Sequence, residues 1–207
     1  MGVELNSDLN MFGPDVVTWE YGQLGGRVRP IDRDILFKNL VDVHNVLDKY
    51  KIRHWLSHGT VLGAIREGNF LAHDDDCDLG LDFSERHLWK PAQEDLRRMG
   101  FHCPDGDPNK PISKDNAPYW DLNAIRDGEK VEGWCFEKQS DDYWIYDKQR
   151  CGNTLRHPGK YYNTLDDFNF RGVVFKIPAH VNPDWLEMMY GKTWNIEDKN
   201  AKYRSYA

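Results

Sequence analysis

The feature that most constrains how this chain folds is an acidic segment in which carboxylates and apolar residues alternate. Asp74, Asp76 and Asp78 occupy every second position. The apolar residues interleaved with and following these acids are Cys77, Leu79, Leu81 and Phe83. Side chains at every second position of an extended strand point to the same face, so we expect a strand with these carboxylates along one edge. A bound cation relieves their mutual repulsion, and Mg²⁺ prefers oxygen ligands of this kind.

Two other interpretations of the acidic segment stay open. Acidic runs are often solvated loop faces, although such a loop has no need of the apolar alternation. The second alternative is a calcium-binding loop of the EF-hand type. Its ligand positions one, three, five, nine and twelve would be taken by Asp74, Asp76, Asp78, Asp82 and Glu85. Position six of such a loop requires glycine, but Leu79 stands there and Gly80 comes one residue late.

A glycine turn precedes the acidic segment. Gly59 and Thr60 open a short helix that is expected to reach Glu67 and to end at Gly68. The N-terminus of such a helix presents backbone N–H groups and a positive dipole end, which suits a phosphate, and glycine lets a ligand approach the backbone closely. Arg66 adds a charge for a diphosphate, or forms a surface ion pair with a nearby acid.

The stretch from Gly59 to Leu81, GTVLGAIREGNFLAHDDDCDLGL, resembles the signature of the LicD/fukutin family of phosphotransferases. That family usually shows Gly-Thr-Leu-Leu-Gly-Ala, then an arginine, then an acidic Asp-Asp-x-Asp strand, and it belongs to the nucleotidyltransferase-fold superfamily. The segment KIPAHVNPDWLEMMYGKTWNIEDK resembles the family's C-terminal module. One departure is His73, which stands where the family commonly has an aromatic residue, often Trp.

The resemblance implies an α+β fold, a nucleotidyltransferase-type mixed β-sheet with flanking helices. It also implies transfer of a phospho-alcohol, of the phosphocholine or ribitol phosphate type, from a CDP-activated donor to a glycan hydroxyl with release of CMP. Mg²⁺ or Mn²⁺ would be the cofactor. The implied catalytic and metal-binding residues are Asp76, Asp78 and Asp121. The implied substrate-binding residues are Gly59, Thr60, Arg66 and Asp74.

The third carboxylate of the site is open between two residues. The superfamily takes it from a later strand, and Asp121 lies between apolar residues in Tyr-Trp-Asp-Leu. Asp121 would complete the metal site or take the acceptor's proton. The other candidate is Asp147, in Trp-Ile-Tyr-Asp.

Charge and hydropathy exclude some functions. The 27 Lys and Arg residues against 34 Asp and Glu give a net charge of −7, which disfavours general nucleic-acid binding because that depends on cations that neutralise phosphates. No apolar run has the length of a membrane span and no secretory signal is evident. We therefore expect a cytoplasmic protein, or one of the secretory pathway if the sequence is a piece of a longer chain. A metal-dependent glycosyltransferase and a non-enzymatic calcium-binding module remain rival functions.

The remaining pattern predicts a single domain over residues 31–207 after an irregular lead-in over 1–30. Apolar residues recur every three or four positions from 32 to 50, which is typical of an amphipathic helix. A strand is expected over 52–56 and another over 173–177. Asp127-Gly128 predicts a hairpin between residues 119–125 and 131–137. Asn182 is expected to cap a C-terminal helix that Gly191 ends.

Overall fold

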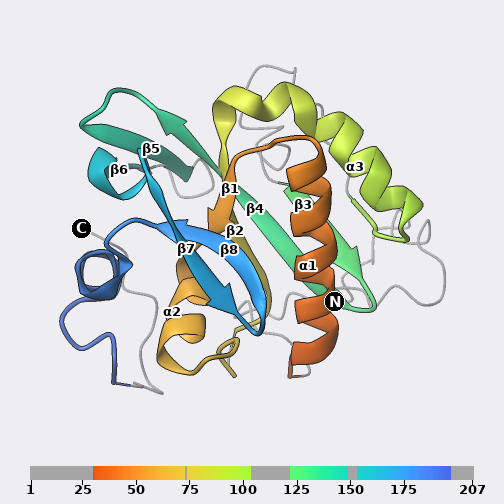
Figure 1. The fold of residues 1–207 in the computed structure, drawn as a ribbon, viewed down its shortest axis with the longest axis horizontal. Helices are drawn as coiled ribbons and strands as arrows, with labels where there is room; N and C mark the ends of the chain where they lie inside the picture. Colours follow the sequence, from red (N-terminus) through yellow and green to blue (C-terminus); the bar gives the residue numbers. More distant parts are fainter. Residues whose placement is uncertain (1–29, 73, 104–121, 149–152, 197–207) are drawn as a thin grey trace, which may run out of the picture.

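The computed structural model describes residues 30–72, 74–103, 122–148 and 153–196. The expected lead-in lies outside these ranges except for its last residue, and Asp121 and His73 also lie outside them. The described residues form a mixed β-sheet with helices packed on it and a separate two-stranded hairpin (Figure 1). This arrangement confirms the expected α+β class.

The sheet has six strands, in the order β1-β2-β4-β5-β6, with β3 also pairing with β4. The strands are β1 (His54–Leu56), β2 (Cys77–Asp82), β3 (Leu122–Arg126), β4 (Glu129–Lys138), β5 (Tyr143–Lys148) and β6 (Asn153–Pro158). The pair β2–β4 is parallel and the other pairs are antiparallel. The separate hairpin consists of β7 (Leu165–Phe170) and β8 (Val173–Pro178).

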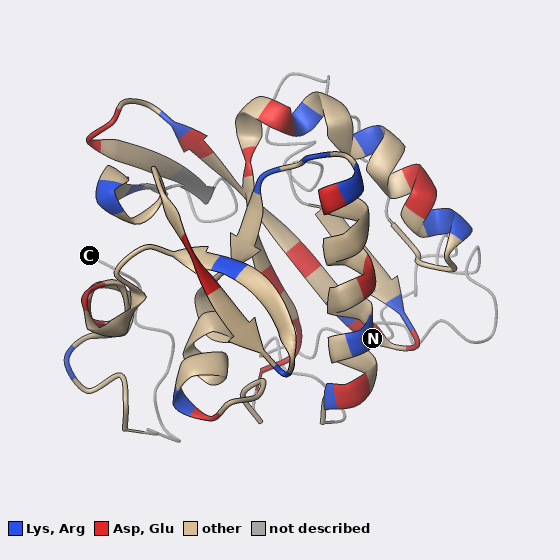
Figure 2. Ribbon diagram, in the orientation of Figure 1, with Lys and Arg blue, Asp and Glu red and all other residues tan. Residues whose placement is uncertain are grey.

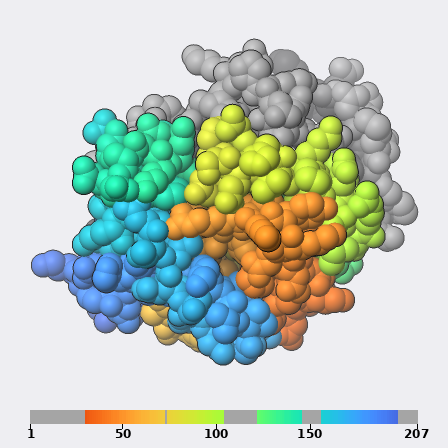
Figure 3. All heavy atoms as spheres, turned by 45° about the horizontal axis from the view of Figure 1, so that its top comes forward, coloured from red at the N-terminus to blue at the C-terminus, as the bar shows by residue number. Residues whose placement is uncertain are grey.

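The helices are α1 (Arg33–Lys49), α2 (His58–Arg66), α3 (Trp89–Arg98) and α4 (Leu186–Tyr190). Shorter helical turns are η2 (Phe83–Leu88), η5 (Gly159–Tyr161) and η6 (Val181–Trp185). Helix α1 lies against β4, β3 and α3, and α2 lies against β2. In the space-filling view of Figure 3, α1 is next to the β7–β8 hairpin, and the edge-on contact of Phe37 with Phe170, at 5.6 Å between ring centroids, joins the two.

Helix α1 forms where the apolar period places it. Leu36, Leu40, Val43 and Leu47 are fully buried, so the expected apolar face is the one that meets the sheet. The Asp32 carboxylate accepts hydrogen bonds from the backbone N–H groups of the first turn, which satisfies donors that have no partner inside the helix. The helix expected from the sequence is confirmed.

Two close approaches hold the middle of the sheet together. A side chain on Gly80 would place its Cβ 2.2 Å from the Trp55 ring on the neighbouring strand β1, so the indole lies across the glycine. A Cβ on Gly133 of β4 would lie 2.6 Å from Leu81 Cδ1 on β2. Glycine at these two positions therefore lets bulky side chains pack directly over the backbone.

The two turns predicted from the sequence have different outcomes. Asp127 and Gly128 both have positive φ and join β3 to β4, which confirms the predicted hairpin. The helix predicted after Asn182 is interrupted: Asn182 has an extended backbone (φ −117°, ψ 117°), as residues before a helix do, at a kink inside η6, and α4 spans only Leu186–Tyr190. Before α4 the chain makes a wider turn, in which the Trp185 backbone N–H donates to the His180 carbonyl at 3.1 Å.

Basic and acidic residues are interspersed over the ribbon, as along α3, where acids in the middle separate basic residues at its two ends (Figure 2). Within the described ranges, no helix combines the length and the apolar character needed to cross a bilayer.

Candidate active site

Three carboxyl groups meet where the parallel strands β2 and β4 begin. Asp78 of β2 is in register with Glu132 of β4, and Asp76 immediately precedes β2. One carboxylate oxygen from each of the three lies within 4.8 Å of the others, and all three residues are buried. We call Asp76, Asp78 and Glu132 the acid cluster.

Glu132 was missed by the sequence reasoning. The structure does not describe Asp121, and it places Asp147 on β5 opposite Thr154 of β6 without describing its side chain. A signal for Glu132 was present, because it stands between Val131 and Gly133 in the second strand of the predicted hairpin. What the sequence does not contain is the pairing partner of that strand.

Asp74 differs from the expected arrangement. The strand begins at Cys77, so Asp74 precedes it and does not continue the row of Asp76 and Asp78. Asp74 instead groups with Asp75 and Asp76 and lies against Gly59. Because residues 77–82 are a strand paired on both sides, the EF-hand-type loop considered above does not form.

The N-terminus of α2 is fixed beside the acid cluster. The Thr60 hydroxyl accepts a hydrogen bond from the backbone N–H of Asp78 at 2.8 Å. The backbone N–H of Ser57 donates to the Asp78 carbonyl at 3.0 Å. These two bonds tie the glycine turn to the start of β2, so that the positive end of the helix dipole and the carboxylates face one small region.

A glycine is required at position 59. A Cβ built there would lie 2.3 Å from Asp74 Oδ2, which is well inside van der Waals contact. We expect Gly59→Ala to displace the Asp74 carboxyl group, to lower activity, and to cost about 1–3 kcal/mol in the free energy of unfolding, as overpacking does. Denaturant unfolding and the transfer assay described below measure the two effects.

Gly63, one turn further along α2, is the matched control. A Cβ there would meet the Asn69 carbonyl oxygen at 2.6 Å, and a backbone atom cannot move aside as a side chain can. Gly63→Ala should therefore be the more destabilising variant. Adding Asp74→Ala to Gly59→Ala should restore stability, and a double variant no more stable than Gly59→Ala would show that the clash lies elsewhere.

Two side chains of β4 contact the carboxyl groups directly. Lys130 Nζ is 2.6 Å from Asp76 Oδ2 and 2.8 Å from Glu132 Oε2. Trp134 Nε1 donates a hydrogen bond to Asp78 Oδ1 at 2.7 Å. Lys130, Glu132 and Trp134 share one face of β4, because side chains two residues apart point the same way.

Burial perturbs the acidity of these groups. Burial, followed by repulsion from Asp76 and Asp74, raises the pKa of Asp78 well above its ordinary value. Burial and then the charges of Asp76 and Asp75 raise the pKa of Asp74 to about 7. Burial also raises the pKa of Glu132, although Lys130 opposes it. For Lys130, burial favours the neutral amine, but the attraction of Asp76 and Glu132 outweighs it and raises the pKa.

The donor set fits a hard divalent cation. All three members of the acid cluster offer oxygen atoms, and oxygen ligands suit Mg²⁺ and Mn²⁺ more than metals that favour nitrogen or sulfur. One ammonium, that of Lys130, contacts two of the three carboxyl groups, and a single positive charge cannot balance three carboxylates. Burial is the first cause of the raised pKa of Asp78, and repulsion from the neighbouring carboxylates is the second.

Arg66 lies at the opposite end of α2 from Gly59 and Thr60. Its guanidinium pairs with the neighbouring Glu67, with Nη2 2.7 Å from Oε1, and also donates to the Trp194 carbonyl at 3.5 Å. Arg66 was expected either to bind a diphosphate or to form an ion pair with a nearby acid, and the structure contains the ion pair.

Residues 51–180 match the family model described as LicD/FKTN/FKRP, nucleotidyltransferase domain. Uncharacterized proteins of Rickettsia typhi and Rickettsia prowazekii are 29% and 39% identical over 66 residues. That stretch is 32% of this chain and only 21% and 25% of those proteins.

Among solved structures, the lincosamide antibiotic adenylyltransferase LnuA with bound lincomycin is similar with a TM-score of 0.48 and 12% identity. The similarity covers 78% of this chain and 89% of that one. The family match, in contrast, extends over more than half of the chain; it includes α2 and the strands β2 and β4, at which the acid cluster lies.

Proposed function

This chain belongs to the LicD/FKTN/FKRP family of nucleotidyltransferase domains, and on that premise we propose that it is a metal-dependent phosphotransferase. The reaction would move a phospho-alcohol, of the phosphocholine or ribitol phosphate type, from a CDP-activated donor to a glycan hydroxyl. The observation that carries the proposal is the acid cluster beside the N-terminus of α2. The acid cluster would hold a cation for a diphosphate, and the backbone N–H groups at the start of α2 would bind the phosphate oxygens.

The residues take distinct parts in this proposal. Asp76, Asp78 and Glu132 would hold Mg²⁺ or Mn²⁺, and the ion, when bound, neutralises charge on phosphate oxygens. Phosphoryl transfer depends mainly on positioning and charge stabilisation. The Trp134 indole donates a hydrogen bond to Asp78 Oδ1. This bond fixes the orientation of the Asp78 carboxyl group, as the partners of metal-binding carboxylates do.

The phosphate groups of the donor would lie at the start of α2. Gly59 and Thr60 form that start, and the Thr60 bond to β2 holds it in place. Asp74, packed against Gly59, would support the wall of the site. Arg66 would need to leave Glu67 to reach a diphosphate, so we assign it the smallest share of donor binding.

The acceptor hydroxyl oxygen bonds to the phosphorus that bears the alcohol, and the phosphoanhydride bond to the cytidine-side phosphate breaks. CMP leaves with the bridging oxygen, and the hydroxyl proton passes to a base. Asp121 was expected either to complete the metal site or to accept this proton. Because Glu132 would be the third carboxylate of the metal site, we assign Asp121 the role of accepting the proton.

The identity of the released nucleotide tests this proposal. Incubation with CDP-choline or CDP-ribitol, a glycan and Mg²⁺ should yield CMP, because attack falls on phosphorus. In a glycosyltransferase the acceptor attacks a sugar carbon of the donor, and the whole nucleoside diphosphate is released. Chromatography of the nucleotide products separates these outcomes.

The same assay distinguishes the phosphotransferase from the two rival functions, a glycosyltransferase and a calcium-binding module. UDP released from a UDP-sugar, or CDP released from a CDP-alcohol, would show that the phosphotransferase assignment is wrong even if the acid cluster binds metal. Tight binding of Ca²⁺ without turnover of any donor would favour the calcium-binding module. Glu132→Gln should lose CMP release in parallel with Asp78→Asn, since both side chains are placed in one cluster.

A further inference from the structure

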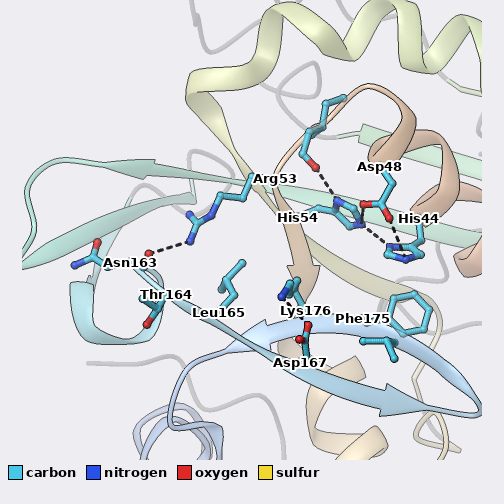
Figure 4. Close-up of a pocket in the computed structure, with 12 residues that line it drawn as sticks. His44, Asp48, Arg53, His54, Asn163, Thr164, Leu165, Asp167, Phe175 and Lys176 are labelled. Carbon is cyan, nitrogen blue, oxygen red and sulfur yellow. Dashed lines mark hydrogen bonds and ion pairs between the residues drawn. The ribbon is translucent and has the colours of Figure 1, made fainter.

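A second group of side chains that could bind a metal ion, His44, Asp48 and His54, lies outside the acid cluster. A pocket of about 590 Å³ opens between the end of α1, β1 and the β7–β8 hairpin. Figure 4 shows His44, Asp48 and His54 turned toward one another at one side of this pocket. His54 is in register with Leu81 near the end of β2, whereas the acid cluster is at the beginning of that strand.

The three side chains converge from two elements. His44 and Asp48 are four residues apart on α1 and therefore lie on the same face of the helix. His44 Nδ1 is 2.7 Å from His54 Nε2. Asp48 carboxylate oxygens are 3.5 Å from His44 Nε2 and 3.9 Å from His54 Nε2. One ligand atom from each residue can be chosen so that all lie within 4.8 Å.

The hydrogen bonds determine which imidazole nitrogen carries hydrogen. His54 Nδ1 is 2.7 Å from the Ile52 carbonyl, which can only accept, so Nδ1 holds the hydrogen and Nε2 presents a lone pair. That lone pair faces His44 Nδ1. The Ile52 carbonyl thus orients His54 in the way that a second partner typically orients a metal-binding histidine.

Neither neutral form of His44 satisfies both of its neighbours. With hydrogen on Nδ1, its Nε2 lone pair faces the Asp48 carboxylate. With hydrogen on Nε2, its Nδ1 lone pair faces that of His54. A cation between the three side chains removes this conflict.

We propose that His44, Asp48 and His54 bind a divalent transition-metal ion of the Zn²⁺ class. Two imidazoles and one carboxylate form a common zinc ligand set, and Zn–N bonds of about 2.0–2.1 Å put tetrahedral ligand nitrogens about 3.3 Å apart. The two imidazole nitrogens, now 2.7 Å apart, therefore need to separate by about 0.6 Å. Nitrogen donors favour such an ion over Mg²⁺, and a fourth position would be open toward the pocket.

The test is calorimetric titration of the full chain with Zn²⁺, after chelator treatment and in excess Mg²⁺, which competes for the oxygen-only acid cluster. The native protein should bind about one equivalent of Zn²⁺. His54→Gln and Asp48→Asn should each weaken binding at least about tenfold. Co²⁺ in place of Zn²⁺ should give visible absorption bands that both variants lose.

Asp167→Asn is the matched control. Asp167 lines the same pocket but pairs with Lys176 at 2.6 Å, so zinc affinity should not change. If His54→Gln does not fold, Asp48→Asn still tests the zinc site. The Asp48 side chain is 63% exposed, so this substitution should not prevent folding. Zinc affinity unchanged in Asp48→Asn, zinc binding lost in Asp78→Asn, or no zinc binding by the native chain would each overturn the proposal.

Discussion

Replacing Asp78 with asparagine is expected to lower the kcat of transfer strongly and to leave the metal-free protein at least as stable as the native one. The asparagine side chain keeps an oxygen that can accept the Trp134 hydrogen bond, so the packing is preserved. The substitution removes a buried carboxylate whose ionisation the folded protein resists. Loss of one group that stabilises transition-state charge lowers kcat by about 10²–10³-fold, which the CMP-release assay measures.

The free energy of unfolding contributed by Asp78 is expected to depend on pH. The folded-state pKa of Asp78 is raised above 3.8, so the folded state holds its proton at pH values where the unfolded chain has lost it. The stability associated with Asp78 is therefore full below about pH 4 and declines as pH rises through the folded pKa. Asp78→Asn should flatten this decline in unfolding experiments made with EDTA.

Asp82, at the other end of the same strand, provides the contrasting variant. Its carboxylate accepts from the Ser84 backbone N–H at 3.0 Å and caps η2. Asp82→Ala should cost about 1 kcal/mol of stability, as loss of a cap does, with transfer activity retained. If Asp78→Asn instead lowers stability strongly, the acid cluster is a structural network and the catalytic assignment is wrong.

Replacing Lys130 with methionine should have the largest effect on stability. The Lys130 ammonium contacts Asp76 and Glu132, and its side chain is only 11% exposed. Methionine preserves most of the apolar stem but leaves buried carboxylates without their partner. Breaking a buried ion pair on one side costs about 3–5 kcal/mol, which we expect to lower Tm by about 10 °C in EDTA.

Metal should compensate for this loss. A ligand that binds only the folded state stabilises it by about 2.7 kcal/mol at one hundred times its Kd. Mg²⁺ or Mn²⁺ should therefore raise the Tm of Lys130→Met more than that of the native protein, in which the ammonium already contacts two of the carboxyl groups. A Tm for this variant that does not respond to either ion would contradict the metal assignment.

Lys138→Met is the control on the same strand. Lys138 pairs with Asp141 at 2.6 Å, but the two side chains are 43% and 89% exposed. Exposed ion pairs contribute about 0–1 kcal/mol, so this variant should unfold close to the native temperature with or without metal. A loss as large as that of Lys130→Met would indicate a general effect of removing lysine from β4.

The elements whose signal is local could be predicted from the amino-acid sequence. The apolar period identified α1, because helical neighbours three and four residues apart share one face. The alternation around Asp76 and Asp78 identified β2, and Asp127-Gly128 identified the turn between β3 and β4. The family was also recognisable from contiguous residues, since its signature lies within the stretch from Gly59 to Leu81.

Which distant residues contact one another could not be predicted, because it depends on how the elements pack. Glu132 joins Asp78 because β2 and β4 pair in parallel across more than fifty residues of chain, and strand pairing over such a separation leaves no local pattern in sequence. The same pairing brings Lys130 to Asp76. His54 meets His44 only after β1 has packed beside α1. Side-chain spacing along one element is set by backbone geometry, whereas contacts between elements depend on how their faces pack in three dimensions.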